Sequence, residues 1–310
     1  MIFLQKAEIS GLNFGDDITD DFYNEIFRSE VEGREQSSIR NLVYIMGSII
    51  GQNESTNYVH NYYGAGFGFS KKAPKNNAIH FVRGPLSEEF LGNKSPFYAD
   101  AAYITLCFEK YSSFINELKL SPKKGYGYVP HHSNTSSNFS VRFCRENGLK
   151  FIDPRRHWKE VLRDLSGCEG VYAEAMHGAI FSDVLRVPWV PVFTTTNLSC
   201  FRWLDYCLGA GTSFRPLIYM NLIEKFVFRR NLRAVGSSQK EIMDLYYSEV
   251  SKSKLEKSIN KRLLRLSRIF SQSRSFEVPE NTDWQLTSDK YIRDVSENIY
   301  ESINNSVRFL

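Results

Sequence analysis

The chain has 310 residues, 42% hydrophobic and 14% aromatic, which is enough to build a large core without disulfides or a structural metal. The net charge is only +4. Eight Lys and Arg side chains against one Glu fall within 251–275, so the remaining residues carry a net charge of about −3. This distribution argues against a nucleic-acid-binding protein, whose basic surface would be more widely spread.

Three further features of the composition indicate a cytoplasmic protein. No apolar run reaches the roughly 20 residues that a membrane-spanning helix needs, and the first residues lack the basic and apolar regions of a secretion signal. The five cysteines are scattered and include no CxxC pair. They predict reduced thiols, with neither a disulfide framework nor a metal site.

The first part of the chain alternates between predicted strands and helices. Strands are expected at 2–9, 42–50 and 78–82, helices at 16–27 and from 87 to 91, and a glycine loop at 64–68. After a linker at 121–125, strands are expected at 126–130, 151–152, 170–173 and 189–193, and helices at 140–147, 157–165, 176–185 and 200–208. Such alternation predicts an α/β fold with parallel sheets. We therefore expect two Rossmann-like domains, 1–120 and 121–236, that face one cleft.

A helical tail is expected over 237–310. Its last helix is predicted at 289–307, with Ile292, Val295, Ile299 and Ile303 on one face. The segment 252–274 is basic and amphipathic and has two interpretations. It either makes a peripheral contact with an anionic membrane or packs on its own protein with a solvated basic face, which we favour.

The first group of candidate site residues lies where a strand gives way to a helix. Asn13, Gly15, Asp16 and Asp17 surround a helix start whose free N–H groups can hold an anion. The aspartates oppose an anion there, so we expect them to receive substrate hydroxyls or to act as bases. The alternative is that they only cap the helix.

A glycine loop and an arginine form the second group. Gly64 and Gly66 allow a ligand to approach the backbone closely, although a plain loop is an equally good interpretation. Arg83 ends a strand, where its guanidinium can pair with a carboxylate or a phosphate. The alternative for Arg83 is a structural salt bridge.

Two histidine-containing segments complete the candidates. His131, His132 and Ser133 follow a strand, and because side chains alternate along a strand we expect one histidine to face the cleft. They suit anion binding or proton transfer better than a metal, since no third ligand is suitably spaced.

The second of these segments contains the sharpest candidate in the chain. Glu174, Met176, His177 and Gly178 join a strand to a helix, and His177 can donate to an anion or transfer a proton. We expect Gly178 to let a ligand approach the start of that helix.

Five short motifs, taken in order, resemble the polysaccharide pyruvyltransferases. They are Asn-Phe-Gly-Asp-Asp at 13–17, Val-Arg-Gly-Pro at 82–85, Tyr-Val-Pro-His-His at 128–132, Ile-Asp-Pro at 152–154 and Glu-Ala-Met-His-Gly-Ala-Ile at 174–180. The resemblance covers about residues 8–205 and is nearest to the bacterial exopolysaccharide members. Met176 stands where many members have Leu, and residues 99–102 match a Gly-Asp-Pro-Ala element only loosely.

The resemblance implies a GT-B-like fold and transfer of the pyruvyl group of phosphoenolpyruvate to two sugar hydroxyls, with release of phosphate and without a cofactor. It implies that His177 binds the donor anion and acts as general acid, that Arg83 clamps the donor, and that Asp16 or Asp17 is the acceptor base. The implied acceptor is a sugar of an exopolysaccharide or of a lipid-linked repeat unit at the inner membrane face.

Two other functions remain open at this stage. The first is a sugar-nucleotide glycosyltransferase, since one fold serves several chemistries. The second is a non-catalytic protein that binds glycan within a polysaccharide assembly.

Overall fold

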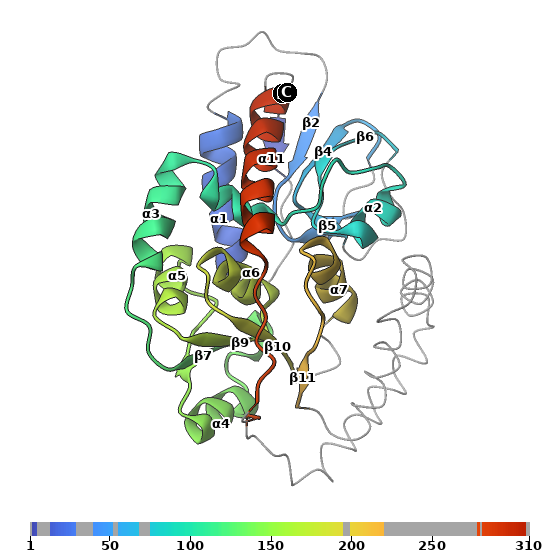
Figure 1. Cartoon of the computed structure of the whole chain (residues 1–310). Helices are drawn as coiled ribbons and strands as arrows, with labels where there is room; N and C mark the ends of the chain where they lie inside the picture. Colours follow the sequence, from blue (N-terminus) through green and yellow to red (C-terminus); the bar gives the residue numbers. More distant parts are fainter. Residues whose placement is uncertain are drawn as a thin grey trace, which may run out of the picture.

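The computed structural model describes residues 2–4, 13–28, 40–51, 55–67, 75–194, 199–219, 278–279 and 281–307. Within these ranges the chain forms an α/β structure with two main parallel sheets (Figure 1). The prediction of parallel sheets and helices is confirmed, while the relation to the GT-B fold stays a prediction. The basic segment 252–274 lies outside the described residues.

The first sheet has four parallel strands. They are β1 (Ile2–Leu4), β2 (Asn41–Tyr44), β4 (Val59–Tyr63) and β6 (Asn77–Phe81), in the order β1-β2-β4-β6. The helices that belong to this part are α1 (Phe14–Phe22), which continues as a π-helical turn (Tyr23–Arg28), α2 (Pro85–Leu91), a 3-10 helix (Ala101–Leu106) and α3 (Glu109–Lys119).

The prediction of one strand over 42–50 is wrong. The chain turns after β2, with Gly47 at φ +91°, and Ser48–Ile50 forms a separate strand β3. Strand β3 pairs with β5 (Gly66–Phe67) in a small parallel sheet of its own. Both halves of the segment are mostly buried, so a continuous apolar run does not distinguish one long strand from two short ones.

The second sheet has five parallel strands. They are β7 (Tyr126–Val129), β8 (Lys150–Phe151), β9 (Gly170–Ala173), β10 (Trp189–Phe193) and β11 (Leu217–Ile218), in the order β11-β10-β9-β7-β8. The helices are α4 (Asn138–Asn147), α5 (Trp158–Ser166), α6 (Met176–Val184) and α7 (Cys200–Gly209), with a 3-10 turn at His132–Asn134.

The two main sheets share one continuous apolar core. Phe14 of α1 packs against Phe181 of α6 with ring centroids 5.6 Å apart, and Trp158 of α5 donates its ring N–H to Asp21 at 2.8 Å. This core includes residues on both sides of position 120, so it marks no boundary there. The predicted division of the chain at 120 and 236 stays a prediction.

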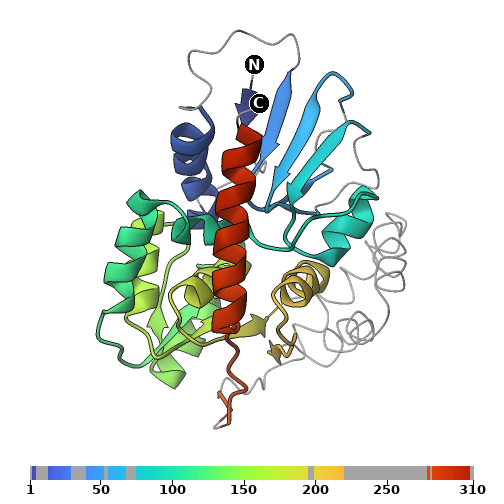
Figure 2. The same cartoon turned by 45° about the horizontal axis from the view of Figure 1, so that its top comes forward.

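The C-terminal helix returns to the first sheet. Helix α11 (Asp289–Val307) has the predicted bounds, and Val295, Ile299 and Ile303 of the predicted stripe are buried. It lies beside the fan of strands, with α1 and α3 on its other side (Figure 2). Tyr63 of β4 donates its hydroxyl to Ser306 at 2.9 Å, so the end of the chain is bonded to the first sheet.

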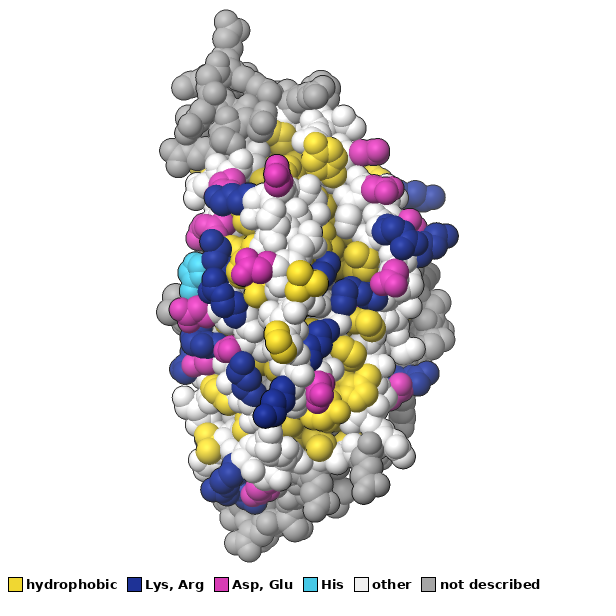
Figure 3. Space-filling model, turned by 60° about the vertical axis from the view of Figure 1, so that its left-hand side comes forward, with side chains coloured by type: hydrophobic (Ala, Val, Ile, Leu, Met, Phe, Trp, Pro, Cys, Tyr) yellow, Lys and Arg dark blue, Asp and Glu magenta, His cyan; other side chains and the backbone are white. Residues whose placement is uncertain are grey.

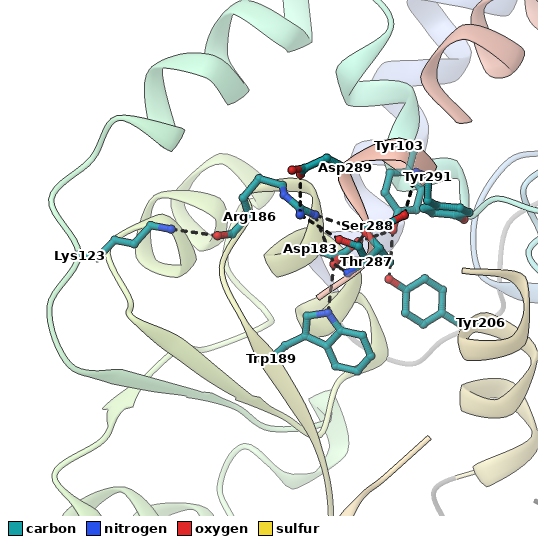
Figure 4. Close-up of polar contacts among 10 residues, drawn as sticks. All are labelled: Tyr103, Lys123, Asp183, Arg186, Trp189, Tyr206, Thr287, Ser288, Asp289 and Tyr291. Atoms are coloured by element: carbon teal, nitrogen blue, oxygen red, sulfur yellow. Dashed lines mark hydrogen bonds and ion pairs between the residues drawn. The ribbon is translucent and has the colours of Figure 1, made fainter. Parts of the chain in front are cut away.

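The segment before α11 is hydrogen-bonded to the buried carboxylate of Asp183, which lies on α6 beside the second sheet (Figure 4). Asp183 accepts hydrogen bonds from the Tyr103 hydroxyl at 2.7 Å and the Trp189 ring N–H at 3.4 Å. Thr287 donates its backbone N–H at 2.8 Å and its hydroxyl at 2.5 Å. Gln285 and Trp189 also exchange two backbone hydrogen bonds. The C-terminal segment therefore connects both sheets.

Thr287→Val is expected to lower the free energy of unfolding by about 1.5–3 kcal/mol, because a buried carboxylate loses one hydrogen-bond donor. Urea denaturation measures this difference. Thr282→Val serves as the control, since the Thr282 hydroxyl bonds to the Tyr172 hydroxyl at 3.3 Å and to the carbonyl of Pro279 at 3.0 Å, and neither of these partners is charged. Equal losses in the two variants would contradict the role given to Asp183.

The surface agrees with the nearly balanced charge of the chain. On the face turned forward in Figure 3, basic and acidic side chains are interspersed rather than separated. Among the described residues, no helix combines the length and the apolar character that crossing a bilayer requires.

Candidate active site

The order of strands in the second sheet locates the candidate site. Along β8-β7-β9-β10-β11 the direction of winding reverses between β7 and β9. In doubly wound sheets ligands bind at the carboxyl ends of the strands at this switch point. His131 follows β7 and His177 follows β9, so both predicted histidine segments lie at this edge of the sheet.

His177 lies on the first turn of α6, where the two sheets meet. The residue is 7% exposed, and its ring packs against Phe14 of α1. A Cβ atom added to Gly15 would lie 2.0 Å from Nδ1 of the ring. Gly15 is therefore required by the close approach of the imidazole, which gives this glycine a packing role.

The imidazole of His177 is neutral at neutral pH in this state. Burial lowers its pKa to about 4, the charge of Asp16 opposes this shift, and the charge of Arg83 adds to it. The ring atom Nε2 is buried and has no hydrogen-bond partner among the described residues. Since buried polar atoms normally have a partner, Nε2 is the atom that a ligand would contact.

This pKa shift predicts an acid-sensitive contribution to stability. The folded-state pKa of about 4 lies below the ordinary 6.5, so between these values the unfolded chain binds more protons. The contribution is present above pH 6.5 and is lost as the pH falls towards 4, by at most about 3 kcal/mol. His177→Gln should therefore lose less stability than the wild type between pH 7 and pH 4.5 in urea denaturation.

His157→Gln, which replaces an exposed imidazole, is the control for this pH comparison. Identical pH profiles for His177→Gln and the wild type would contradict the burial of His177 as a neutral ring.

Arg83 is fully buried and forms the salt bridge that was the alternative interpretation. Its Nε lies 3.3 Å from a carboxylate oxygen of Asp205, and its Nη1 donates to the Ser48 hydroxyl at 3.0 Å. Its Nη2 is buried and finds no hydrogen-bond partner in the part of the chain that the structure describes, and a Cβ on Gly66 would lie 1.9 Å from it. Any contact of Arg83 with a ligand therefore depends on Nη2.

Asp205 joins the first and second sheets at this point. Asp205 lies on α7. Its carboxylate accepts hydrogen bonds from the backbone N–H groups of Leu86 and Ser87 on α2, at 3.0 Å each, and from the Ser87 hydroxyl at 2.5 Å. The start of α2 has no side-chain cap from its own segment, and Asp205 of α7 supplies that cap. The sequence contained a signal for this residue, because Asp205 is the one acidic residue in the apolar helix 200–209.

Asp100 is a second buried carboxylate that was not among the predicted site residues, although it lies in the loosely matching element 99–102. Its Oδ1 accepts the backbone N–H of Ala102 at 3.0 Å, while Oδ2 is buried and no described residue bonds to it. Burial raises its pKa to about 6, against the opposing charge of Arg83. Ala101, which follows Asp100, accounts for the glycine at position 64. A Cβ atom on Gly64 would lie 2.4 Å from the backbone nitrogen of Ala101.

The rings of His131 and His132 lie next to each other, with centroids 4.1 Å apart. The strand β7 ends at Val129, so the alternation of side chains along a strand does not extend to the histidines. That one of them faces the cleft stays a prediction. Nδ1 of His131 lies 2.8 Å from the Ser133 hydroxyl oxygen. Burial, together with the charges of His132 and Arg202, lowers the pKa of His131 to about 4.

Glu174 holds this histidine turn in place. It accepts the backbone N–H of His131 at 2.8 Å, the Asn134 amide at 3.0 Å and the Tyr128 hydroxyl at 3.2 Å, and it also contacts the Thr194 hydroxyl. Through these four contacts Glu174 positions the histidine turn. A contact between Glu174 and a ligand stays a prediction.

The remaining predicted residues surround the same junction. Asn13 donates its amide to Asp16 at 2.9 Å, and Asp16 is the aspartate whose charge acts on His177. Half-buried Met176 packs on the core, and a Cβ on Gly178 would lie 3.0 Å from Val129. Gly178 thus seats α6 against β7, which is a packing role. Asp17 stays a prediction as a base.

The fold and this junction together define an α/β protein with a buried polar site at a sheet switch point. Residues 43–195 match the family model described as polysaccharide pyruvyl transferase. The matched region belongs to that family, which confirms the resemblance drawn from the motifs. It contains Arg83, Asp100 and His177 but begins after Asp16.

One curated relative is similar to part of the chain. The succinoglycan biosynthesis protein ExoV of Rhizobium meliloti (strain 1021) is 32% identical over 158 residues, which cover 49% of this chain and 48% of that protein. The chain thus matches about half the length of this relative. A search of solved structures found none that matches.

Proposed function

We propose that this chain transfers the pyruvyl group of phosphoenolpyruvate to two hydroxyls of a sugar in an exopolysaccharide or lipid-linked repeat unit. The support comes from the family of residues 43–195 and from one observation above all. That observation is the buried His177 ring, whose Nε2 has no partner and which lies within the fields of Asp16 and Arg83.

The proposed reaction forms a cyclic ketal. Two sugar oxygens bond to C2 of phosphoenolpyruvate, and the bond from C2 to the phosphate oxygen breaks. One hydroxyl proton ends on the methylene carbon, which becomes a methyl group, and the other leaves with the phosphate. No oxidant or cofactor is needed for this balance.

In this proposal His177 transfers the first proton. Because burial keeps its imidazole neutral before a ligand arrives, it begins as a base that accepts a hydroxyl proton. Asp16 and the anionic donor then stabilise the imidazolium, which protonates the methylene carbon as a general acid. This order extends the role that the sequence motifs implied for His177.

The donor anion is proposed to lie between Arg83 and the histidine turn. The Nη2 atom of Arg83 suits the donor carboxylate, while His131, His132 and Arg202 suit the phosphate. The charge of Arg202 already acts on His131, and a bound phosphate would raise the pKa of both histidines. The proposal also includes a cytoplasmic location for the protein and a peripheral membrane contact through residues 252–274.

The test is incubation of the full chain with phosphoenolpyruvate and acceptors that carry galactose, glucose or mannose. The expected result is an acceptor mass that rises by one pyruvyl ketal, with one phosphate released per transfer. Thermal-shift measurements should show stabilisation by phosphoenolpyruvate. Stabilisation by nucleotide sugars alone, with a gain of one hexose, would instead favour the glycosyltransferase. Glycan binding without any phosphate release would favour the non-catalytic alternative.

A further inference from the structure

The carboxylate of Asp100 is placed beside Arg83 by the fold. Val82 and Tyr98 form an isolated parallel bridge, and Ala99 donates its backbone N–H to the Val82 carbonyl at 2.9 Å. Asp100 follows directly and is fully buried. It is close enough that the charge of Arg83 acts on its carboxyl group.

The local role of Asp100 uses only one of its two oxygens. Oδ1 caps the 3-10 helix at Ala102, a task that Asn or Ser performs equally well. Oδ2 is buried without a partner, and an unsatisfied buried polar atom is costly to a fold. Capping therefore does not account for a carboxylate at this position.

The unpartnered atoms near Asp100 have complementary chemistry. Nη2 of Arg83 is a donor, Oδ2 of Asp100 is an acceptor, and neither has a hydrogen-bond partner. The charge of Arg83 also acts on His177, whose Nε2 is a further atom of this kind among the described residues. A hydroxyl donor for Oδ2 and an anionic acceptor for Nη2 would satisfy the two atoms that lie beside each other in the fold.

We infer that Oδ2 of Asp100 binds a hydroxyl of the acceptor sugar and holds it beside Arg83. This inference rests on the proposed function, because it assigns Asp100 to the sugar and leaves the donor anion to Arg83 and the histidine turn. Asp100 thereby supplies a carboxylate for one of the two hydroxyls that the reaction uses.

The test compares the wild type with Asp100→Asn and Asp100→Ser, both of which keep a capping oxygen. Each variant should lower kcat/KM for the acceptor by about 10- to 100-fold, as expected for a hydrogen bond to a charged group. Binding of phosphoenolpyruvate, measured by calorimetry, should change by less than about 2-fold. Ser306→Ala, which alters a hydrogen bond on α11 far from this carboxylate in sequence, is the control and should keep the wild-type kinetics.

A stability measurement separates this role from a purely structural one. The folded-state pKa of Asp100 is raised, so wild-type stability is lost as the pH rises through about 6. The Asn variant should therefore have a higher unfolding midpoint than the wild type at pH 7.5, and a smaller advantage at pH 5. A structural carboxylate would give a lower midpoint at both pH values.

Each outcome decides the question. Wild-type protein that releases no phosphate from phosphoenolpyruvate overturns the proposed function, and the inference with it. Wild-type transfer with an unchanged acceptor kcat/KM in both variants overturns the inference alone. Equal loss of donor and acceptor binding, with a lower unfolding midpoint, also overturns it by showing structural damage.

Discussion

Replacing Asp205 with alanine is expected to lower the free energy of unfolding by about 3–5 kcal/mol, because it leaves Arg83 as a buried charge without its partner. Both side chains of the pair are 0% exposed. The alanine also removes the acceptor for Leu86, Ser87 and the Ser87 hydroxyl at the start of α2. Urea denaturation followed by circular dichroism measures the loss.

Asp283→Ala is the matched control for this prediction. Asp283 also pairs with an arginine, Arg215, but the two side chains are 56% and 64% exposed. Exposed pairs contribute at most about 1 kcal/mol, so the control should change little. A loss below about 1 kcal/mol for Asp205→Ala would show that the buried pair does not hold α2 and α7 together.

His177→Gln is expected to reduce kcat for pyruvyl transfer by about 100- to 10,000-fold, the range for loss of a general acid or base. Glutamine keeps a polar group of similar length but cannot accept and return a proton at neutral pH. The readout is phosphate release under saturating phosphoenolpyruvate and acceptor, with the same unfolding transition required for wild type and variant.

The control for the kinetic prediction is His157→Gln, which replaces an exposed histidine at the start of α5 and should leave kcat unchanged. Near-normal turnover by His177→Gln would remove His177 from the chemistry. The proposed function would then need another proton carrier, and Asp16 would be tested next.

The elements predicted most accurately are those whose signal is entirely local. The bounds predicted for β9, β10 and α11 are the observed ones, since short apolar runs and a helical stripe follow from neighbouring residues. Strand β4 was not predicted, because His60 and Asn61 interrupt its apolar pattern. Both are buried, and Asn61 is satisfied by Asn41 on β2 at 3.1 Å, a contact that no local pattern reveals.

The sequence by itself determined the alternation of strands and helices, the family of the matched region and the position of His177 at a strand-to-helix junction. Only the tertiary structure decided which buried polar atoms have partners. Arg83 and Asp205 are 122 positions apart, and Asp183 meets Thr287 across 104 positions. Hydrophobic periodicity depends on neighbouring residues, whereas the satisfaction of a buried charge depends on which distant segments the fold brings together.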